Sequence, residues 1–429
     1  MRILVVSWGD FERWNNIEYR FGNETSVGPS TLPILQKVLK PHWTVVIIPD
    51  TLGRNFESVE ALRDDVRNRA LDFLERIGAG REVDIVIVPG IGEFSHGTFR
   101  GSAMDAYHYT LYRLSQIIPS QDDLDIHFDI THGINYLTFL AYRALMGLLG
   151  ISAIANDVEL TAYNSDPYVR GISTRLNINI IEKTKVSPEP LNRPCPGTSG
   201  LLKPVKIEGN HLATMERNYG IPGGIHKIKP WLDAWIGSVF FGLPLAFLEE
   251  FNDVKLLDEI IEKTVSLWGS GIEVAPGKVT RRIGFNEGFS TLVRAAFQMK
   301  TLERFRKVAP FTLEDLYDVS SRIFRGSTRA RIKTEIGKIE DEAIAYMERG
   351  ETTDWIPLRE FLNYSRANVQ VKPRNFLAHA GFEANVTEVK VDHVSKNPAK
   401  DAKKHTYLRY SEDNRDRIRS IISKALREV

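Results

Sequence analysis

The first half of the chain alternates short apolar runs with longer amphipathic segments. Four runs rich in valine and isoleucine predict buried parallel strands, at residues 2–8, 44–50, 84–90 and 125–131. Apolar residues recur at helical spacing in 30–39, 56–77, 102–117 and 134–149, and two later segments, 159–165 and 176–186, again resemble strands. This order predicts a doubly wound, Rossmann-like α/β sheet of about six strands.

A different pattern begins after residue 186. Residues 187–197 contain four prolines and can form neither a helix nor a central strand, so they indicate a domain boundary. We expect an α/β domain over 1–186, a linker over 187–229 and a mainly helical region over 230–429, with no β-rich module except a possible strand at 386–391. The candidate helices in that region are 231–251, 254–268, 287–308, 313–324, 328–349 and 407–427.

The length indicates several domains, and positive charge is concentrated near the C-terminus. The 429 residues, 42% hydrophobic and 26% charged, suit a soluble protein of two or three domains. The formal net charge is +1, but residues 359–429 contain 15 Lys/Arg and 9 Asp/Glu and therefore carry +6. Such a region suits a polyanionic substrate, although a solvated helical surface is the common alternative. The same two interpretations apply to a second basic cluster, which consists of Arg322, Arg325, Arg329, Arg331 and Lys333.

Cysteine content and the N-terminus bear on the cellular compartment. Cys195 is the only cysteine, which excludes an intrachain disulfide and a cysteine-rich zinc site. Met1 leads directly into a predicted strand, and no apolar run approaches the length of a membrane span. We therefore expect a cytoplasmic protein that does not associate with membranes.

The stretch with the most chemical content follows Pro373. A proline fits the first position of a helix, which places Arg374 and Asn375 in a first turn whose free amides favour an anion. Asn375 and His379 are four residues apart and therefore share one helical face, and Arg374 is long enough to reach the same point. Gly381 then ends the helix.

Arg374, Asn375 and His379 could cleave RNA without a metal ion. A guanidinium can neutralise charge on a phosphorane, an imidazole can transfer a proton at the 2′-hydroxyl or the leaving 5′-oxygen, and an amide can orient either group. The competing interpretation is an arginine at a helix end beside an ordinary structural histidine. Apolar Phe376 and Leu377 would anchor the helix under either interpretation.

A second group of candidates lies at the predicted carboxyl ends of strands, where open α/β sheets bind ligands. Glycines allow a ligand to approach the backbone, amides at helix starts suit phosphates, and an indole suits stacking on a base. Alternatively, these are the turn, capping and core residues of any Rossmann-like domain. The candidates for a nucleotide-type ligand are Trp8, Gly9, Thr25, Ser26, Gly90, Thr131, His132, Gly133 and Asn135, with Thr25 and Ser26 expected in a polar loop.

Two short motifs do not support other nucleotide chemistry. Residues 90–95 imitate a dinucleotide fingerprint, but they follow the third predicted strand and carry Ser95 in place of the last glycine. Gly277-Lys278-Val279 resembles the end of a phosphate-binding P-loop, yet Val279 replaces the required hydroxyl residue. Neither a dehydrogenase nor an ATPase is predicted.

The combination of motifs resembles the CARF-HEPN ribonucleases of type III CRISPR systems, in particular the archaeal-type accessory members of the Csx/Csm group. The resemblance spans nearly the whole chain and depends on residues 129–135 after the fourth strand and on Arg374, Asn375 and His379, which match the HEPN motif. It implies that the CARF domain senses cyclic oligoadenylate, with cyclic tetra-adenylate the first choice. It also implies that the HEPN domain then degrades single-stranded RNA in antiviral defence, with no cofactor required.

One histidine per chain is few for RNA cleavage, because one group must deprotonate the 2′-hydroxyl while another assists the leaving oxygen. A two-fold homodimer, alone or within a higher homo-oligomer, would supply two copies each of Arg374 and His379, and a near-symmetric activator would suit a pocket on the same axis. Activator between the CARF domains would then shift the dimer arrangement that spaces the HEPN residues. The alternative function is a nucleotide-sensing, nucleic-acid-binding regulator without catalysis.

Overall fold

The computed structural model describes residues 1–80, 82–198, 200–364, 371–393 and 397–429, which form two compact units. The first unit consists of Met1–Glu189, Gly197–Gly223 and Asp258–Phe297, and the second of Pro190–Pro196, Gly224–Leu257 and Gln298–Val429. The expected domain boundaries at 186 and 230 remain a prediction. The compact units divide the chain differently, because residues 258–297 group with the N-terminal unit rather than with the helical region.

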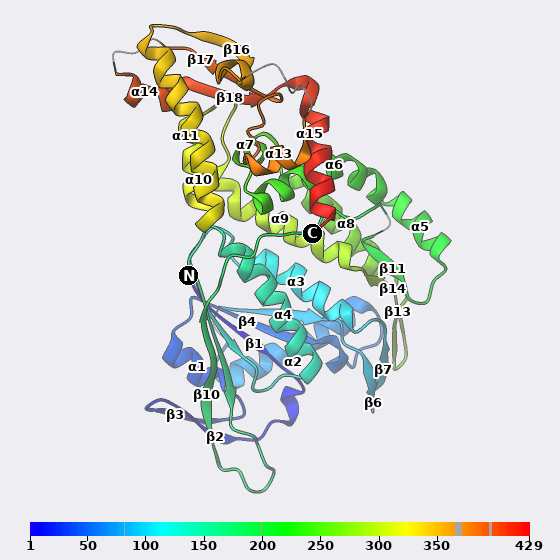
Figure 1. Ribbon diagram of the computed structural model, residues 1–429. Coiled ribbons are helices and arrows are strands. Elements are labelled where there is room, and N and C mark those ends of the chain that lie inside the picture. The colour runs from blue at the N-terminus through cyan, green and yellow to red at the C-terminus, as the bar shows by residue number, and fades with distance from the viewer. Residues whose placement is uncertain (81, 199, 365–370, 394–396) are drawn as a thin grey trace. The chain divides into compact units, whose positions relative to one another are not determined.

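The first unit is built on a mixed sheet of eight strands in the order β3-β2-β10-β9-β8-β1-β4-β5 (Figure 1, blue to green). The neighbours β9, β8, β1, β4 and β5 run parallel, whereas β10 runs antiparallel to β9. All six predicted strands are confirmed, and so is the Rossmann-like α/β class. Their bounds are β1 Arg2–Ser7, β4 Trp43–Pro49, β5 Val83–Val88, β8 Leu124–Asp129, β9 Val158–Ser165 and β10 Arg175–Lys185.

A hairpin extends the sheet beyond the predicted strands. β2 (Ile17–Phe21) and β3 (Glu24–Gly28) pair antiparallel around a two-residue loop in which Gly22 has a φ of 61°. The prediction of a polar loop through Thr25 and Ser26 is therefore wrong, and both residues lie on the edge strand. Alternate residues of β2 are buried, which is the period of a strand with one covered face.

Helices cover both faces of this sheet. α1 (Leu32–Leu39) and α2 (Val59–Arg76) form a core with Leu4 of β1. α3 (Met104–Ile117) and α4 (Asn135–Ser152) pack against each other on the other face (Figure 1). The helical spacing in the sequence predicted all four helices to within three residues of these bounds. Because β1 and β8 are parallel neighbours, the loops that follow them lie at the same edge of the sheet.

Two small sheets complete the first unit. One has the order β12-β13-β7-β6, and the other pairs β11 with β14. The expectation that a single possible strand interrupts the region after residue 230 is wrong here, because strands of three or four residues carry too little periodicity to be recognised by pattern. The bounds are β6 Gly92–Phe94, β7 Gly97–Arg100, β11 Leu202–Pro204, β12 Ile272–Ala275, β13 Lys278–Arg281, β14 Ile283–Phe285 and α5 Gly209–Asn218.

The second unit is mainly helical and carries a four-stranded sheet in the order β15-β18-β17-β16. β17 (Thr387–Val391) confirms the predicted strand, but the other three were not predicted. The single helix expected over 407–427 is instead β18 (Thr406–Tyr410) followed by α15 (Arg415–Arg427), because alternate residues of β18 are buried. The remaining strands are β15 Phe311–Thr312 and β16 Thr353–Pro357.

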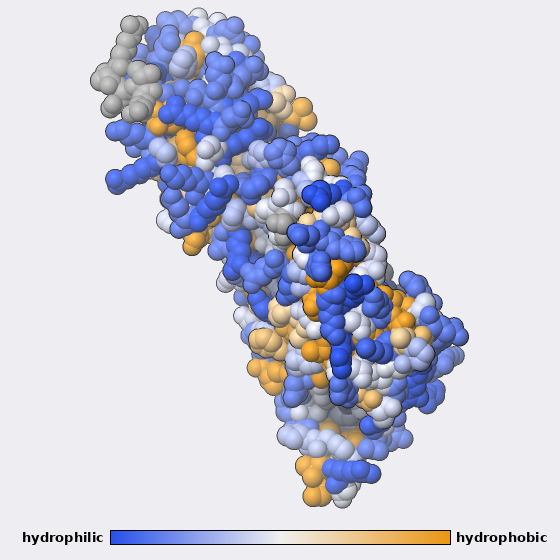
Figure 2. All heavy atoms as spheres, turned by 90° about the vertical axis from the view of Figure 1, so that its right-hand side faces the viewer, coloured by the Kyte–Doolittle hydropathy of each residue, from blue (hydrophilic) through white to orange (hydrophobic). Residues whose placement is uncertain are grey.

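Of the helices not yet described, α6 to α9 lie within residues 221–302 and α10 to α14 lie within residues 313–405. Where the structure describes the chain, it contains no helix that is long and apolar enough to cross a membrane. Figure 2 shows one face that is mostly hydrophilic, with its hydrophobic side chains in separate patches. The bounds are α6 Ile221–Phe241, α7 Pro244–Glu249, α8 Lys255–Ser270, α9 Glu287–Leu302, α10 Leu313–Ile323, α11 Gly326–Glu348, α12 Leu358–Phe361, α13 Pro373–Ala378 and α14 Pro398–His405.

Candidate functional site

The three predicted catalytic residues lie on α13 and in the turn that follows it. Pro373 occupies the first turn, as its fixed φ favours, and Arg374 and Asn375 follow it directly. His379 is the residue after the last helical one, and its N–H donates to the carbonyl of Asn375 at 2.9 Å. The helix ends there because Ala380 and the predicted Gly381 both have positive φ, 51° and 85°.

The apolar side of α13 anchors it in the second unit. Phe376 is fully buried, and its ring centroid lies 6.0 Å from that of Tyr410 on β18. The hydroxyl of Tyr410 donates to the carbonyl of Gly381 at 3.2 Å. A Cβ at Gly381 would lie 2.7 Å from that hydroxyl oxygen, so position 381 requires glycine for space as well as for conformation.

Asn375 and His379 line one cavity of about 120 Å³. The side chain of His379 is 48% exposed, so a substrate can reach it. Arg374 is exposed, does not line the cavity, and makes no hydrogen bond or ion pair with the described residues. The structure thus brings two of the three predicted residues together within one chain. The cavity is also lined by Glu335, Lys338, Ile339, Leu358, Leu362, Tyr364, Phe382, Glu383 and Ala384.

Helix α11 supplies polar partners that the sequence interpretation missed. Nδ1 of His379 lies 3.2 Å from Oε2 of Glu335, and Nζ of Lys338 donates to Oε1 of the same carboxylate at 2.8 Å. One turn earlier, Arg331 donates to the carbonyl of Leu377 at 3.0 Å and also to the carbonyl of Phe241. Burial lowers the pKa of Arg331 below its ordinary value, although this guanidinium remains charged at neutral pH.

A signal for this arrangement existed in the sequence. Arg331, Glu335 and Lys338 recur at intervals of four and three residues and therefore share one face of α11. Arg331 was assigned to a basic cluster, either a solvated face or an RNA path, but its guanidinium instead binds backbone carbonyls beside the site.

A second cavity, of about 350 Å³, lies in the first unit at the carboxyl end of β8. Thr131 and His132 line it, and the ring of Trp14 stacks on the imidazole of His132 with a centroid separation of 4.1 Å. Burial lowers the pKa of His132 to about 4, so the ring is neutral at physiological pH and acts by stacking and hydrogen bonding. The remaining lining residues are Arg13, Asn15, Ile17, Tyr19, Pro29, Asn164, Ser165, Asp166, Pro167, Tyr168 and Leu176.

A groove of about 540 Å³ adjoins this cavity, because both are lined by Thr131 and Asn164. Gly133 and Asn135, two more of the predicted ligand residues, lie in the groove. The structure therefore brings four of the nine predicted ligand residues to one edge of the sheet. The groove is also lined by Ile130, Thr138, Phe139, Tyr142, Ala162, Ile181 and Glu182.

Trp8 and Gly9 support this edge from behind. Trp8 is buried, and its ring centroid lies 5.4 Å from that of Trp14, so it packs against the residue that stacks on His132. The N–H of Gly9 donates to the carbonyl of His132 at 2.8 Å, and a Cβ there would lie 3.1 Å from the side chain of Ile134. Neither residue lines the cavity or the groove.

Gly90, Thr25 and Ser26 also lie outside the cavity and the groove. The carbonyl of Gly90 accepts a hydrogen bond at 2.7 Å from the buried guanidinium of Arg281, which also pairs with Asp50. Arg281 comes from β13, almost two hundred residues further along the chain, and occupies the carboxyl end of β5. Part of the predicted ligand edge is therefore filled by the protein itself.

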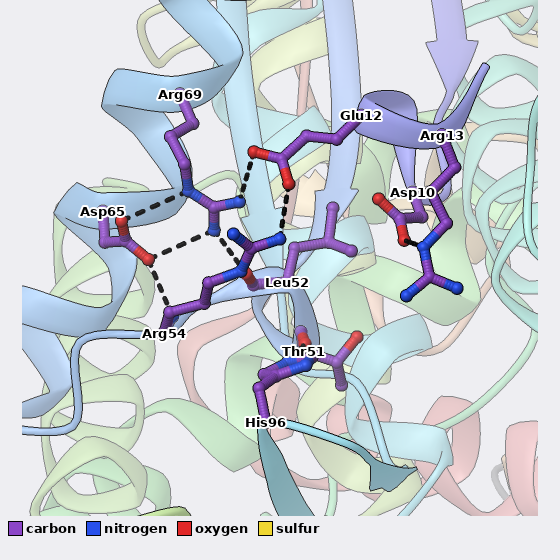
Figure 3. Close-up of polar contacts among 9 residues, drawn as sticks. All are labelled: Asp10, Glu12, Arg13, Thr51, Leu52, Arg54, Asp65, Arg69 and His96. Atoms are coloured by element: carbon purple, nitrogen blue, oxygen red, sulfur yellow. Dashed lines mark hydrogen bonds and ion pairs between the residues drawn. The ribbon is translucent and has the colours of Figure 1, made fainter. Parts of the chain in front are cut away.

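A charge network holds the segment that carries Trp14. Glu12, in the short helix η1 (Phe11–Arg13), pairs with Arg69 at 2.8 Å and with Arg54 at 2.5 Å, and Asp65 pairs with Arg69 (Figure 3). Burial alone would raise the pKa of Glu12, but hydrogen bonds and charge from the two arginines hold it below its ordinary value. The network ties η1 to α2 and so positions the neighbouring wall of the cavity.

Comparison with known proteins finds family models that match two segments of the chain. The model of the CARF domain of the CRISPR system endoribonuclease Csx1 matches residues 3–167, and that of its HEPN domain matches residues 326–412. A relative from Methanocaldococcus jannaschii, described as CRISPR system endoribonuclease Csx1, is 28% identical over 432 residues. That alignment covers 96% of this chain and 91% of the relative. The ligand edge at 131–135 falls in the CARF match, and α11 with α13 falls in the HEPN match.

Proposed function

Because the chain belongs to the CARF-HEPN family of CRISPR system endoribonucleases, we propose that it cleaves single-stranded RNA when cyclic oligoadenylate binds its CARF domain. The single observation that supports the proposal best is the cavity on α13. There an accessible imidazole and an amide share one cavity with a carboxylate at hydrogen-bond distance from the imidazole. Type III CRISPR defence is the setting in which such an activator is made.

The proposed reaction uses the substrate's own 2′-hydroxyl as the nucleophile. His379 takes the proton of this hydroxyl, its oxygen attacks the adjacent phosphorus, and the bond to the 5′-oxygen breaks. The 5′-oxygen leaves with a proton from a second acid, and the product carries a 2′,3′-cyclic phosphate. Arg374 neutralises charge on the phosphorane, and Asn375 orients the phosphate or the hydroxyl. No step requires a metal ion.

A homodimer supplies the second acid. One chain brings a single His379 to the site, and a two-fold partner would contribute its own His379 and Arg374.

The first unit offers an apolar surface that a second copy would cover. Phe139 and Ile181 line the groove and are 65% and 54% exposed, which is costly for a large apolar side chain left in water.

The edge of the CARF sheet is the proposed activator site. The aromatic walls of the 350 Å³ cavity, Trp14, Tyr19 and Tyr168, suit a purine base, and Asn15 and Asp166 suit its polar edges. The adjoining groove would hold the remainder of the ring, with Thr131 in contact with both parts. Cyclic tetra-adenylate is our first choice, because a ring with four repeats matches a two-fold axis.

The test is a cleavage assay with the purified full chain in excess EDTA. Labelled single-stranded RNA is incubated with and without cyclic tetra-adenylate, and His379→Ala serves as the control. Activator-dependent products with 2′,3′-cyclic phosphate ends, absent from the His379→Ala reaction, support the proposal. Retention of intact RNA by a folded protein would instead support a regulator that senses nucleotides and binds nucleic acid without catalysis.

A further inference from the structure

We infer that Glu335 is a positioning residue that fixes which ring nitrogen of His379 faces the RNA; this inference rests on the proposed ribonuclease function. Oε2 of Glu335 lies 3.2 Å from Nδ1 of His379. The Glu335 side chain is 14% exposed, whereas that of His379 is 48% exposed, so the carboxylate lies behind an accessible ring. This contact joins α11 to the C-terminal end of α13, through two residues that are 44 apart in the chain.

The chemistry of the contact determines the tautomer. A carboxylate only accepts hydrogen bonds, so the hydrogen of the neutral imidazole must be on Nδ1. Nε2 then carries the lone pair and is the nitrogen available to deprotonate a 2′-hydroxyl. After that transfer, the carboxylate stabilises the imidazolium, as in other catalytic dyads of this type.

Lys338 fixes the orientation of the carboxylate. Its Nζ donates to Oε1 of Glu335 at 2.8 Å, while Oε2 is the atom that faces His379. The two oxygens therefore have different partners, and a carboxylate turned out of its present plane would lose both. Arg331, one turn earlier on α11, donates to the carbonyl of Leu377, so the same helix holds the backbone next to the imidazole.

The other acidic side chain in the cavity does not compete for this role. Glu383 lines the cavity and is buried, but Oε2 accepts from the N–H of Asn385 and Oε1 accepts from the Asn385 side-chain amide, each at 2.8 Å. Its carboxylate closes a local turn. Among the described residues, Glu335 is the carboxylate that contacts His379.

Glu335→Gln makes a specific test, because Lys338 can only donate hydrogen bonds. The glutamine amide oxygen should turn toward Lys338, which directs the amide NH₂ group toward Nδ1 of His379. The imidazole must then accept at Nδ1 and carry its hydrogen on Nε2, which removes the base. We expect kcat to fall by about 10- to 100-fold while KM stays within about two-fold.

The rescue variant separates positioning from a general structural role. In Glu335→Gln/Lys338→Met the amide is free to flip, so part of the kcat lost in Glu335→Gln should return, with Lys338→Met alone as the reference variant. Glu342→Gln is the matched control, because Glu342 lies two turns along α11 and pairs with Arg349 at 3.7 Å. This control should match the wild type.

Nitrogen-15 NMR of histidine-labelled protein reads the tautomer directly, with the His379 signals assigned from their loss in His379→Gln. The wild type should show a protonated Nδ1, and Glu335→Gln a protonated Nε2. An unchanged tautomer and kcat in a folded Glu335→Gln, or no recovery in the double variant, would overturn the inference. If His379→Ala keeps full activity, the proposed function itself fails, and the two failures are thereby distinguished.

Discussion

Gly133→Ala tests the position of the activator site through a single added methyl group. Gly133 lies in the loop between β8 and α4 and lines the groove. A Cβ at this position would be 1.8 Å from Oγ1 and 3.1 Å from Cβ of Thr138. Thr138 is β-branched, so rotation exchanges its hydroxyl for its methyl group or forces a less favourable rotamer. Thr138, or the loop itself, must move.

The expected magnitude follows from this overlap. Overpacking a well-packed site by one methyl group typically costs about 1–3 kcal/mol. Movement of Thr138 also breaks its hydrogen bond of 3.1 Å to the hydroxyl of Ser7, and Thr138 itself lines the groove. If the groove holds the activator and the displacement opposes binding by that amount, the activator concentration for half-maximal cleavage should rise by about 5- to 150-fold. Basal cleavage should not change.

The assay is an activator titration of RNA cleavage, with calorimetry for affinity and thermal melting for fold. Gly133→Ala/Thr138→Ala removes the 1.8 Å overlap and should recover most of the sensitivity, with Thr138→Ala as its reference. Gly28→Ala is the matched control, because a Cβ at Gly28 would have no neighbour within 4 Å. The reasoning is refuted if folded Gly133→Ala needs no more activator than the wild type, or if the double variant is as insensitive as the single one.

Four further outcomes are expected. His379→Ala and Arg374→Ala should each abolish cleavage with the dimer intact on gel filtration, with a loss of more than about 100-fold for His379; near-normal cleavage by either would remove this site from consideration. Cleavage should persist in excess chelator and leave 2′,3′-cyclic phosphate or 3′-phosphate ends, whereas cutting of a fully 2′-deoxy strand would contradict the mechanism. Calorimetry should find one activator ring per dimer. A stoichiometry of one ring per chain would show that the proposed position of the sensor pocket is wrong. Arg331→Met should lower the free energy of unfolding by about 1–3 kcal/mol in urea, because the carbonyls of Leu377 and Phe241 lose the guanidinium as a donor, and an unchanged midpoint would show that these contacts contribute nothing.

Local patterns were sufficient where the structure depends on neighbours in the chain. The valine- and isoleucine-rich runs predicted the parallel strands, because a strand buried on both faces requires a continuous apolar run. Pro373 and Gly381 predicted the start and end of α13, because each restricts or permits a backbone conformation wherever it occurs. The positions of Arg374, Asn375 and His379 in one motif are likewise a property of the sequence alone.

Contacts between distant segments were decided only by the tertiary structure. Glu335 contacts His379, which is 44 residues further along the chain. Trp14, between β1 and β2, stacks on His132, which lies between β8 and α4. Both distances are set by the packing of whole elements. Arg281 fills the space beside Gly90 for the same reason. Periodicity reports which face of an element is buried but not which element covers it. The sequence therefore determined the six long strands of the main sheet, the motif and its helix, and the fold determined which partner holds the imidazole and which part of the sheet edge is open to a ligand.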